Sequence, residues 1–439
     1  MALSLVPSIA HAYDFSAVNG HGMTIYYNIL NEEEKLCEVT YKTRPVVESY
    51  PNYLTISIPE YANEYKVIAI GENAFYQCSR LKTIEIPKTV EIIGNEAFAF
   101  CKSLKSLTIP KSVWSIGKKT FSYCSDLNEI ILPVSLTDIG DEAFSNCEAL
   151  AAIKIPSSVA TIGKNPFHSC KSLSSISVEE DNPYYNSSNN CNAIIETSTG
   201  TIIAGCKNTA IPETADIIGD WAFYNCSALT SISIPNSVKE IGEMAFIFCD
   251  NLESVTIPAS LASIRNYAFR NCPKLKTITC HVKEPFDIDT SVFEKSNDIT
   301  LYVPYTCSEA YKSIEGWRVI SNIVEMDPPT IPMLISCNSK GSISINNNRS
   351  LTNSIGSVEV YDGYATTFTF TPKPGCKIDQ VILNGLDITA NVQNSTLTCT
   401  IPANSQMIVT FTTEQGDMNN DGIIDISDVV SIVNKILGN

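Results

Sequence analysis

The sequence predicts an α/β solenoid, in which 23-residue units each contribute a short parallel strand and a helical turn. Two observations predict this class: a phenylalanine recurs every 23 residues in two runs, and a cysteine follows three residues behind each one. The eight phenylalanines are Phe75, Phe98, Phe121, Phe144, Phe167, Phe223, Phe246 and Phe269. Because a unit of this size cannot bury its apolar face alone, the units must stack to share a core.

The first residues indicate export. Residues 3–12 combine an apolar stretch, a proline and a small-residue motif that ends at Ala12, as at the end of a signal peptide. Residues 1–12 are therefore predicted to be a signal-peptide remnant, with a frayed apolar N-terminus as the alternative. They lack a basic region, so we expect the true start to lie upstream or to have been trimmed. No later segment reaches the ~18 apolar residues of a membrane span, which predicts a protein that is secreted or held at the cell surface.

Charge and cysteine content narrow the function classes. A formal net charge of -17 and a pI near 4.7 argue against binding to nucleic acid or to an anionic membrane. The repeat cysteines are expected to be buried thiols, because pairing stacked equivalents would need a regular geometry between coils. Cys191 and Cys206 flank a predicted hairpin centred between Ser198 and Thr199, so a cross-strand disulfide is an open alternative there.

Residues 13–66 are predicted to cap the N-terminal end of the stack. Apolar and polar residues alternate along residues 23–29 and 37–41, as they do in the strands of a hairpin. A solenoid end needs such a cover, because its core would otherwise face water.

Each unit of the predicted solenoid, residues 67–326, has three parts. In the first unit, residues 84–86 alternate as a half-buried strand does, and Pro87 ends the strand. The glycine of each Ile-Gly pair, such as Gly94, is expected to make a turn with positive φ. The segment Ala-Phe-x-x-Cys-x-x-Leu places apolar residues three apart, which favours a short helical turn.

This consensus resembles the BspA-like subclass of bacterial leucine-rich repeats over residues 67 to 280. Departures are small: Thr120 and Pro166 replace alanine, and Arg265 replaces glycine. The resemblance implies an adhesin-like surface protein whose solenoid binds a host matrix protein, another cell or a glycan. An extracellular protein or glycan is therefore the expected partner.

Exposed aromatic residues are candidates for ligand contact. They occupy the two variable places between the core phenylalanine and the cysteine, which point outward if the turn is helical: Tyr76, Phe100, Tyr123, Tyr224 and Phe248. Packing between adjacent coils explains the same rings equally well. The outward residues of the strand ribbon are mostly hydroxyls, which suit either a ligand or a solvated sheet face.

Residues 179–216 interrupt the repeats as an island. The spacing between Phe167 and Phe223 is longer than two repeats, and it contains the predicted hairpin. Insertions of this kind project on one face of a solenoid and often carry specificity. Tyr184 and Tyr185 are the expected contact residues, with packing under the hairpin as the alternative.

Two further segments follow the repeats. Residues 281–326 are predicted to cap the C-terminal end, with a strand at 299–303, a helix around Tyr311 and Trp317 as a plug. A stiff proline linker follows at 327–332. Short alternating strands across residues 328–413 predict a small β-sandwich-like module.

The last residues, 414–439, carry the one motif with chemistry. They contain an EF-hand-type loop followed by a helical pattern. Oxygen ligands for calcium stand at the expected loop positions, at Asp417, Asn419, Asp421, Ile423 (through its carbonyl), Asp425 and Asp428. Four carboxylates this close would repel one another without a cation, so Ca2+ is the predicted structural cofactor.

The same loop is similar to a type I dockerin segment, because it has aspartate at position 12 and no preceding helix. That resemblance implies a cohesin-like scaffold as a partner. A dockerin ordinarily has two such segments and this chain has one.

No enzyme active site is predicted. The four histidines, His11, His21, His168 and His281, lie in separate segments, and no pairing of a nucleophile with a base is suggested. Phosphate-binding and dinucleotide-binding signatures are absent. Two functions remain: an adhesin-like binding protein, or a structural spacer attached through its C-terminal dockerin-like segment.

Overall fold

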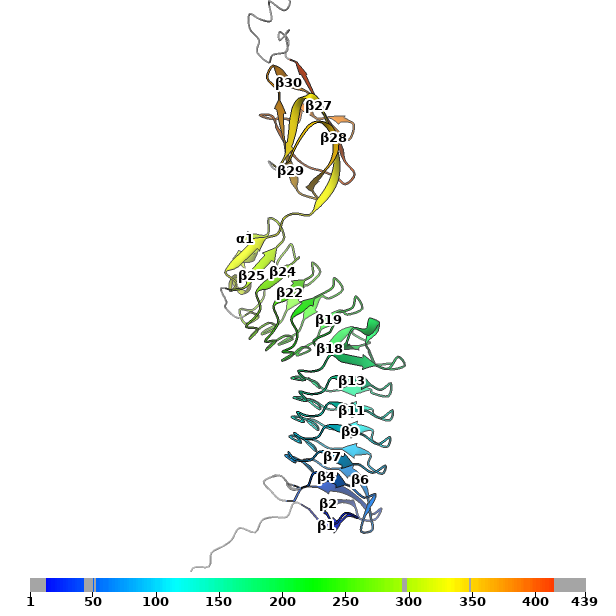
Figure 1. The fold of residues 1–439 in the computed structure, drawn as a ribbon. Coiled ribbons are helices and arrows are strands. Elements are labelled where there is room, and N and C mark those ends of the chain that lie inside the picture. The colour runs from blue at the N-terminus through cyan, green and yellow to red at the C-terminus, as the bar shows by residue number, and fades with distance from the viewer. Residues whose placement is uncertain (1–12, 43–49, 51–52, 294–297, 347–348, 414–439) are drawn as a thin grey trace, which may run out of the picture. The chain divides into compact units, whose positions relative to one another are not determined.

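The structure, a computed structural model, describes residues 13–42, 50, 53–293, 298–346 and 349–413, and it divides the chain between Glu325 and Met326. Figure 1 shows the first unit as a stack of coils and the second as a set of longer strands. The predicted signal-peptide remnant and the calcium loop lie outside the described residues. Within the described part of the chain, no helix has the length and apolar character needed to cross a membrane.

Each coil of the first unit contributes two short strands, and the sequence suggested only one. Equivalent strands of neighbouring coils pair in parallel, for example Glu129 with Ser106. The expected row comprises β7 (Thr83–Glu85), β9 (Ser106–Thr108), β11 (Glu129–Ile131), β13 (Ala152–Ile155), β15 (Ser175–Val178), β20 (Ser231–Ser233), β22 (Ser254–Ile257) and β24 (Thr277–Cys280). A second row ends at the Ile-Gly pairs and comprises β8 (Ile92–Ile93), β10 (Ser115–Ile116), β12 (Asp138–Ile139), β14 (Thr161–Ile162), β19 (Ile217–Ile218), β21 (Glu240–Ile241) and β23 (Ser263–Ile264).

The turn after each Ile-Gly pair is not a helix, which corrects the prediction of helical turns. In all eight coils, numbered here from Phe75 (coil one) to Phe269 (coil eight), the second and sixth residues after the glycine position have φ between 51° and 64°. Residues in this left-handed region interrupt an α-helix, so alternate N–H groups donate to the next coil. The Phe98 N–H donates to the Thr120 carbonyl at 2.9 Å, and the Phe100 N–H donates to the Ser122 carbonyl at 2.8 Å. The coils are therefore joined by hydrogen bonds along their turns as well as their strands.

The glycines of the Ile-Gly pairs are required by close packing, and the expected positive φ is absent from them. A Cβ placed on Gly140 would lie 2.5 Å from the Gly117 carbonyl carbon and from the Lys118 nitrogen. Stacking brings the backbones of adjacent coils together at this point, and only glycine leaves enough room.

Two ladders of phenylalanine rings fill the core. The centroids of neighbouring rings lie 4.8 to 5.5 Å apart and their planes are nearly parallel. The rings are buried, which confirms the predicted core positions. Phe293 adds a rung that the repeat pattern had not included, and Tyr50 covers the other end at 5.1 Å from Phe75.

The repeat cysteines are thiols that link one coil to the next. The Cys124 thiol donates to the Phe98 carbonyl of the preceding coil at 3.2 Å. The same contact recurs at Cys101, Cys147, Cys170, Cys249 and Cys272. Burial raises the pKa of the Cys124 thiol to about 12, so it remains protonated at neutral pH. The structure thus confirms the expectation of thiols in place of disulfides.

The island at 179–216 is built into the stack and does not project from it, which corrects the sequence expectation. It contains β16 (Tyr185–Asn186), a short 3₁₀ turn at Ser188–Asn190 and the hairpin of β17 (Ala193–Glu196) and β18 (Thr201–Gly205), and β18 pairs in parallel with β19 of coil six. Ile194 packs in the core of coils one to five, whereas Ile195 packs in the core of coils six to eight. The hairpin is therefore the layer that joins two apolar cores.

Cys191 and Cys206 do not pair. The hairpin begins in the predicted register, with Glu196 opposite Thr201, but a bulge shifts the pairing by one residue and places Ala193 opposite Gly205. Both cysteines are free thiols, and they pack in different cores. The bulge thus removes the geometry on which the disulfide alternative depended.

Both ends of the stack are covered. At the N-terminal end, β1 (Phe15–Val18), β2 (Thr24–Asn31) and β3 (Leu36–Thr40) are antiparallel, and β3 joins β6 (Tyr65–Ile70); β4 (Thr55–Ser57) and β5 (Tyr61–Ala62) complete this cap. At the C-terminal end lie β25 (Thr300–Val303), α1 (Ser308–Ser313), α2 (Glu315–Arg318) and β26 (Asn322–Glu325). Trp317 is fully buried there, and its indole N–H donates to the Phe286 carbonyl at 2.9 Å. The predicted hairpin and plug are confirmed.

The second unit is an all-β module with a core of its own. Its elements are β27 (Thr330–Ile345), β28 (Arg349–Tyr361), β29 (Ala365–Pro372), β30 (Cys376–Leu383), β31 (Leu386–Asp387), a 3₁₀ turn at Thr389–Asn391, β32 (Thr396–Thr400) and β33 (Gln406–Thr413). The long β27 pairs with β33 through Leu334–Cys337 and with β29 through Gly341–Ile345. This change of partner folds the strands around the core.

Candidate binding groove on the turn face

The turns of coils two to four form a groove. One wall is charged and comes from the second residue after each glycine, and the other wall comes from the sixth residue. Together with a floor of small residues they enclose a hollow of about 180 Å3, lined by Glu96, Ala99, Phe100, Lys119, Ser122, Tyr123, Glu142, Asn146 and His168. We call this hollow the turn groove.

Side-chain size at one repeat position sets the ends of the turn groove. The residue before the sixth position forms the floor, and it is small in Ala99 and Ser122. The equivalent residue is Tyr76 in coil one and His168 in coil five, so a ring stands at each end. In coils six to eight the equivalents are large, namely Tyr224, Ile247 and Arg270. The groove is therefore confined to the coils between Tyr76 and His168.

Aromatic rings form part of the uncharged wall. The Phe100 and Tyr123 rings stack with centroids 4.6 Å apart and planes inclined by 4°, and Tyr76 meets Phe100 edge-on at 5.5 Å. Tyr123 nevertheless remains 45% exposed. Three of the predicted contact residues thus contact one another, Tyr76 from the floor position and the other two from the wall. Packing between coils accounts for part of their surface, and the exposed part is open to a ligand.

Phe100 and Tyr123 have a backbone geometry that is unusual for aromatic residues, and they share it with Phe248. Their φ values are 63° and 60°, in the left-handed region where asparagine is the favoured L-residue, and the equivalent position is indeed asparagine in coils four, six and eight, as Asn146, Asn225 and Asn271. A bulky ring in this conformation is strained, and here the ring also stays partly exposed. The backbone conformation therefore does not favour these rings, and their partial exposure makes them candidates for function.

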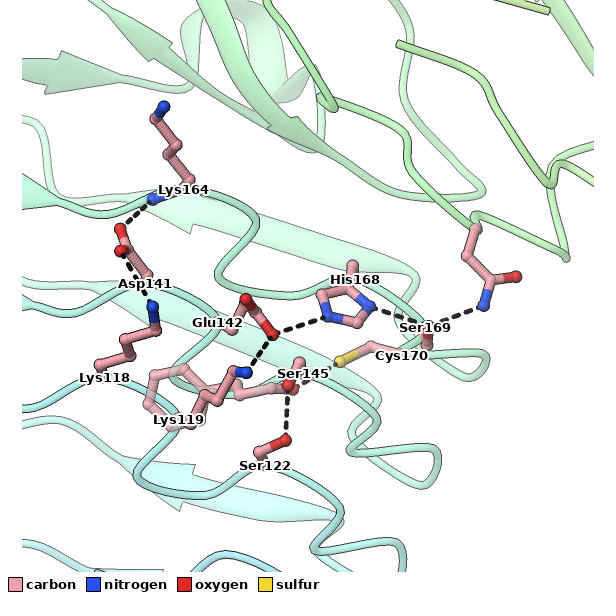
Figure 2. Close-up of polar contacts among 12 residues, drawn as sticks. Lys118, Lys119, Ser122, Asp141, Glu142, Ser145, Lys164, His168, Ser169 and Cys170 are labelled. Carbon is pink, nitrogen blue, oxygen red and sulfur yellow. Dashed lines mark hydrogen bonds and ion pairs between the residues drawn. The ribbon is translucent and has the colours of Figure 1, made fainter. Parts of the chain in front are cut away.

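The charged wall is partly paired. Figure 2 shows the Glu142 carboxylate between the Lys119 ammonium, 3.5 Å away, and the His168 Nε2, 3.6 Å away. The Glu96 carboxylate makes neither an ion pair nor a hydrogen bond with any described residue. The groove thus combines an anchored carboxylate with one that is available to a ligand.

His168 is held in its neutral form at the end of the groove. Burial lowers the pKa of His168, and this effect outweighs the opposing influence of the nearby Glu142 carboxylate. The Asn225 amide donates to the Ser169 hydroxyl oxygen at 2.7 Å, and that hydroxyl lies 3.0 Å from His168 Nδ1. The Ser169 hydroxyl therefore donates to Nδ1, which leaves the Nε2–H facing Glu142. The same chain of contacts links coil five to coil six.

Ser169, His168 and Glu142 have the residue types of a hydrolytic triad, but the Ser169 hydroxyl is not accessible to a substrate. Ser169 is only 5% exposed, and its oxygen already accepts the Asn225 amide. The hollow beside it has a volume of about 20 Å3, which is water-sized. A substrate therefore cannot reach this hydroxyl, and the arrangement is structural.

The other predicted contact residues are dispersed. Tyr224 and Phe248 form a second aromatic pair with centroids 5.8 Å apart, close to the joint between the two cores. Tyr184 is 53% exposed on the island. Tyr185 is buried, and its hydroxyl accepts the Ile162 N–H at 3.1 Å, so its prediction as a contact residue is wrong. It lies under the hairpin because β16 is part of the stack.

The sequence did not indicate the charged wall. Glu96, Lys119 and Glu142 occupy a variable repeat position and look like ordinary solvated side chains in an acidic protein. The charged wall could have been found by aligning the repeats, because the second and sixth positions after each glycine then form two parallel rows. The described residues contain no group of three or more metal-binding side chains, and the predicted calcium ligands Asp417 to Asp428 lie outside the described part.

Comparisons with known proteins concern the first unit. A family model described as BspA type leucine rich repeat region matches residues 52–196 and 203–314. Among solved structures, the pneumococcal vaccine antigen PcpA is 18% identical with a TM-score of 0.50, over 72% of this chain and 99% of that chain. That likeness supports the solenoid fold alone.

Two other solved structures are similar. A leucine rich cell surface protein from Faecalibacterium prausnitzii is 24% identical with a TM-score of 0.46, over 72% of this chain and 95% of that chain. A leucine-rich repeat protein from Bacteroides ovatus is 26% identical with a TM-score of 0.44, over 68% of this chain and 86% of that chain. No curated protein matches the sequence.

Proposed function

Because the chain belongs to the BspA-type leucine-rich repeat family, we propose that it is a secreted or cell-surface binding protein, adhesin-like and without enzymatic activity. Its solenoid would hold an extracellular protein or glycan. The observation that carries this proposal is the turn groove, where Phe100 and Tyr123 keep strained, partly exposed rings beside the Glu96 carboxylate, which pairs with no residue that the structure describes.

The groove has the mixed composition of a recognition site. Binding pockets combine apolar and aromatic surface with a few polar groups that fix the orientation of the ligand. Here the rings of Phe100 and Tyr123 supply the apolar surface, and the polar groups come from Lys119, Glu142 and Asn146. The inaccessibility of Ser169 supports a non-catalytic role for the neighbouring polar network.

Truncation tests which part of the chain binds. The module at 328–413 has its own core, and the first unit ends at Glu325, so the first unit should fold without the module. We expect residues 13–326 to retain the affinity of the full chain for immobilised extracellular matrix proteins and glycans. Loss of all binding in this truncation would transfer the function to the C-terminal part.

A structural role is the second candidate, and the C-terminal sequence favours it. We propose that Asp417, Asn419, Asp421, Asp425 and Asp428, with the Ile423 carbonyl, bind Ca2+, and that the segment attaches the protein to a cohesin-like scaffold. Titration calorimetry on the full chain should detect calcium binding that is lost with Asp417→Ala and Asp428→Ala. Magnesium should substitute poorly, because it requires smaller octahedral geometry and dehydrates reluctantly. Calcium heats that the substitutions leave unchanged would refute the site.

A further inference from the structure

We propose that the turn groove is a subsite for a neutral oligosaccharide of about three sugar rings, one for each of coils two to four. This inference rests on the proposed binding function and specifies the ligand class. It follows from four properties of the groove: its length, its hydrogen-bonding groups, its lack of main-chain donors and its charge.

The length of the groove suits a short sugar chain. His168 lines one end of the groove, and Tyr76 packs against Phe100 at the other. The coils between them repeat at about 4.8 Å, the spacing of paired strands. This spacing is similar to the repeat of linked pyranose rings. Consecutive sugar rings would therefore meet equivalent side chains of consecutive coils, with one sugar face against Tyr123.

The polar groups of the two walls require a ligand that donates hydrogen bonds and also accepts them. Carboxylates such as Glu96 and Glu142 only accept, the Lys119 ammonium only donates, and Asn146 does both. A sugar hydroxyl both donates and accepts, so neighbouring hydroxyls can satisfy these donors and acceptors. Glu142 is held in place by Lys119 and His168 before any ligand arrives (Figure 2), which lowers the entropy lost on binding.

An extended peptide fits the groove less well. Peptides of this kind bind mainly through main-chain hydrogen bonds. The main-chain N–H groups of the groove are used between coils, as from Glu96 to the Lys118 carbonyl at 2.8 Å and from Tyr123 to the Ser145 carbonyl at 2.9 Å. A proline-rich peptide carries few donors and would leave the Glu96 carboxylate unsatisfied.

The charge of the groove selects a neutral ligand. Two carboxylates, Glu96 and Glu142, face one ammonium, Lys119, and His168 is neutral near pH 7. An acidic sugar would meet net repulsion. A cationic ligand would be repelled by the Lys119 ammonium, and the Glu142 carboxylate is already paired with that ammonium.

The test is a titration of the full chain with neutral trisaccharides. The probes are cellotriose, laminaritriose, mannotriose, xylotriose and chitotriose, with trigalacturonic acid as the acidic comparison. We expect at least one neutral probe to bind and the acidic one not to bind. Tyr123→Asn and Glu96→Gln should each weaken that binding by about tenfold or more, which corresponds to ~1.4 kcal/mol.

Phe248→Asn is the matched control, because Phe248 has the same left-handed backbone and a partly exposed ring, but lies beside the filled floor position Ile247. It should leave binding unchanged, and thermal melts of all three variants check that they fold. Failure of every neutral probe, binding of the acidic one alone, or greater sensitivity to Phe248→Asn would overturn the assignment. Retained binding to matrix proteins by the truncated chain would show that the binding function survives such a failure.

Discussion

The glycines of this chain differ in the space that is available for an added Cβ. A Cβ on Gly140 would meet backbone atoms of the preceding coil at 2.5 Å, whereas a Cβ on Gly20 would meet nothing within 4 Å. A side chain can change its rotamer to relieve such a clash, but backbone atoms cannot. Gly140→Ala should therefore lower the free energy of unfolding by about 1–3 kcal/mol, and Gly20→Ala should leave it unchanged or slightly higher. Equal effects in denaturant titrations of the two variants would show that the coils do not approach as described.

The phenylalanine ladder makes a second prediction about single residues. Phe144 is fully buried and stacks on Phe121 and Phe167 at 5.4 and 5.5 Å. Phe144→Ala should leave a cavity and lower the free energy of unfolding by about 3–5 kcal/mol. Equilibrium unfolding in urea measures this change, and a loss below ~1 kcal/mol would contradict the buried ladder.

The backbone strain at Tyr123 can be measured separately from binding. Tyr123→Asn removes the stack on Phe100, worth about 0.5–1.5 kcal/mol. It also relieves a left-handed backbone cost of about 1–2 kcal/mol, because asparagine tolerates that conformation. The two terms should offset, so thermal melts of the variant and the unmodified chain should nearly coincide. A strongly destabilised variant would mean that the ring is retained for packing.

Buried thiols predict the response of the solenoid to alkaline pH. Burial raises the pKa of Cys124 from 9.0 to about 12, so the unfolded chain releases its proton at lower pH than the folded chain does. The stability contributed by this group is complete below pH 9 and is lost as the pH rises towards 12. The free energy of unfolding of the unmodified chain should fall more steeply across that window than that of Cys124→Ala. Parallel pH dependences in the two proteins would contradict a buried neutral thiol.

At the scale of elements, the hairpin of β17 and β18 joins the two halves of the solenoid. Ile194 and Ile195 are adjacent in sequence but pack in different cores. The N–H groups of Asn165, Phe167 and Ser169 make none of the backbone hydrogen bonds within the described residues that their equivalents make to the next coil, so the turns are less tightly joined here. The hairpin therefore carries much of the coupling between the halves.

Alanine substitutions in this hairpin should separate the two halves. Ile194→Ala and Ile195→Ala should each cost about 2–5 kcal/mol as core cavities. Hydrogen exchange should show weakened protection mainly in coils one to five for Ile194→Ala and mainly in coils six to eight for Ile195→Ala. The same protection pattern in both variants would indicate one undivided core.

The sequence predicted those elements whose side chains have a regular period. The ring of Phe75 and its equivalents, the strand at Thr83–Glu85 and the plug of Trp317 all follow from spacing and apolar character. The turns were misread because apolar residues three apart suit both a helix and a turn in which two residues, four positions apart, are left-handed. The second strand row was missed because strands of two residues, such as Ile92–Ile93, are too short to show a pattern.

The candidate site was only half predictable, for a different physical reason. Exposed rings such as Tyr123 stand out in a sequence, whereas Glu96, Lys119 and Glu142 resemble any solvated charges. Their meeting in one groove depends on the stacking of coils, and the small floor residues Ala99 and Ser122 matter only through the larger rings at either end. The size of a floor residue relative to its equivalents in neighbouring coils cannot be judged from one stretch of sequence.

At the scale of the whole molecule, recognition would reside on coils that are held rigid by two ladders and capped at both ends. The module of β27 to β33 packs around a separate core, so its stability should be independent of the solenoid. This separation would allow one chain to carry both the proposed binding surface and the proposed attachment segment.

The most direct measurement of the central proposal is a crystal structure of the full chain with its tightest-binding ligand. The ligand should lie between Tyr76 and His168, with one ring against Tyr123 and a hydrogen bond to the Glu96 carboxylate. A ligand seated on the strand rows, on the second aromatic pair of Tyr224 and Phe248, or on the C-terminal module would contradict the assignment of the turn groove as the binding site.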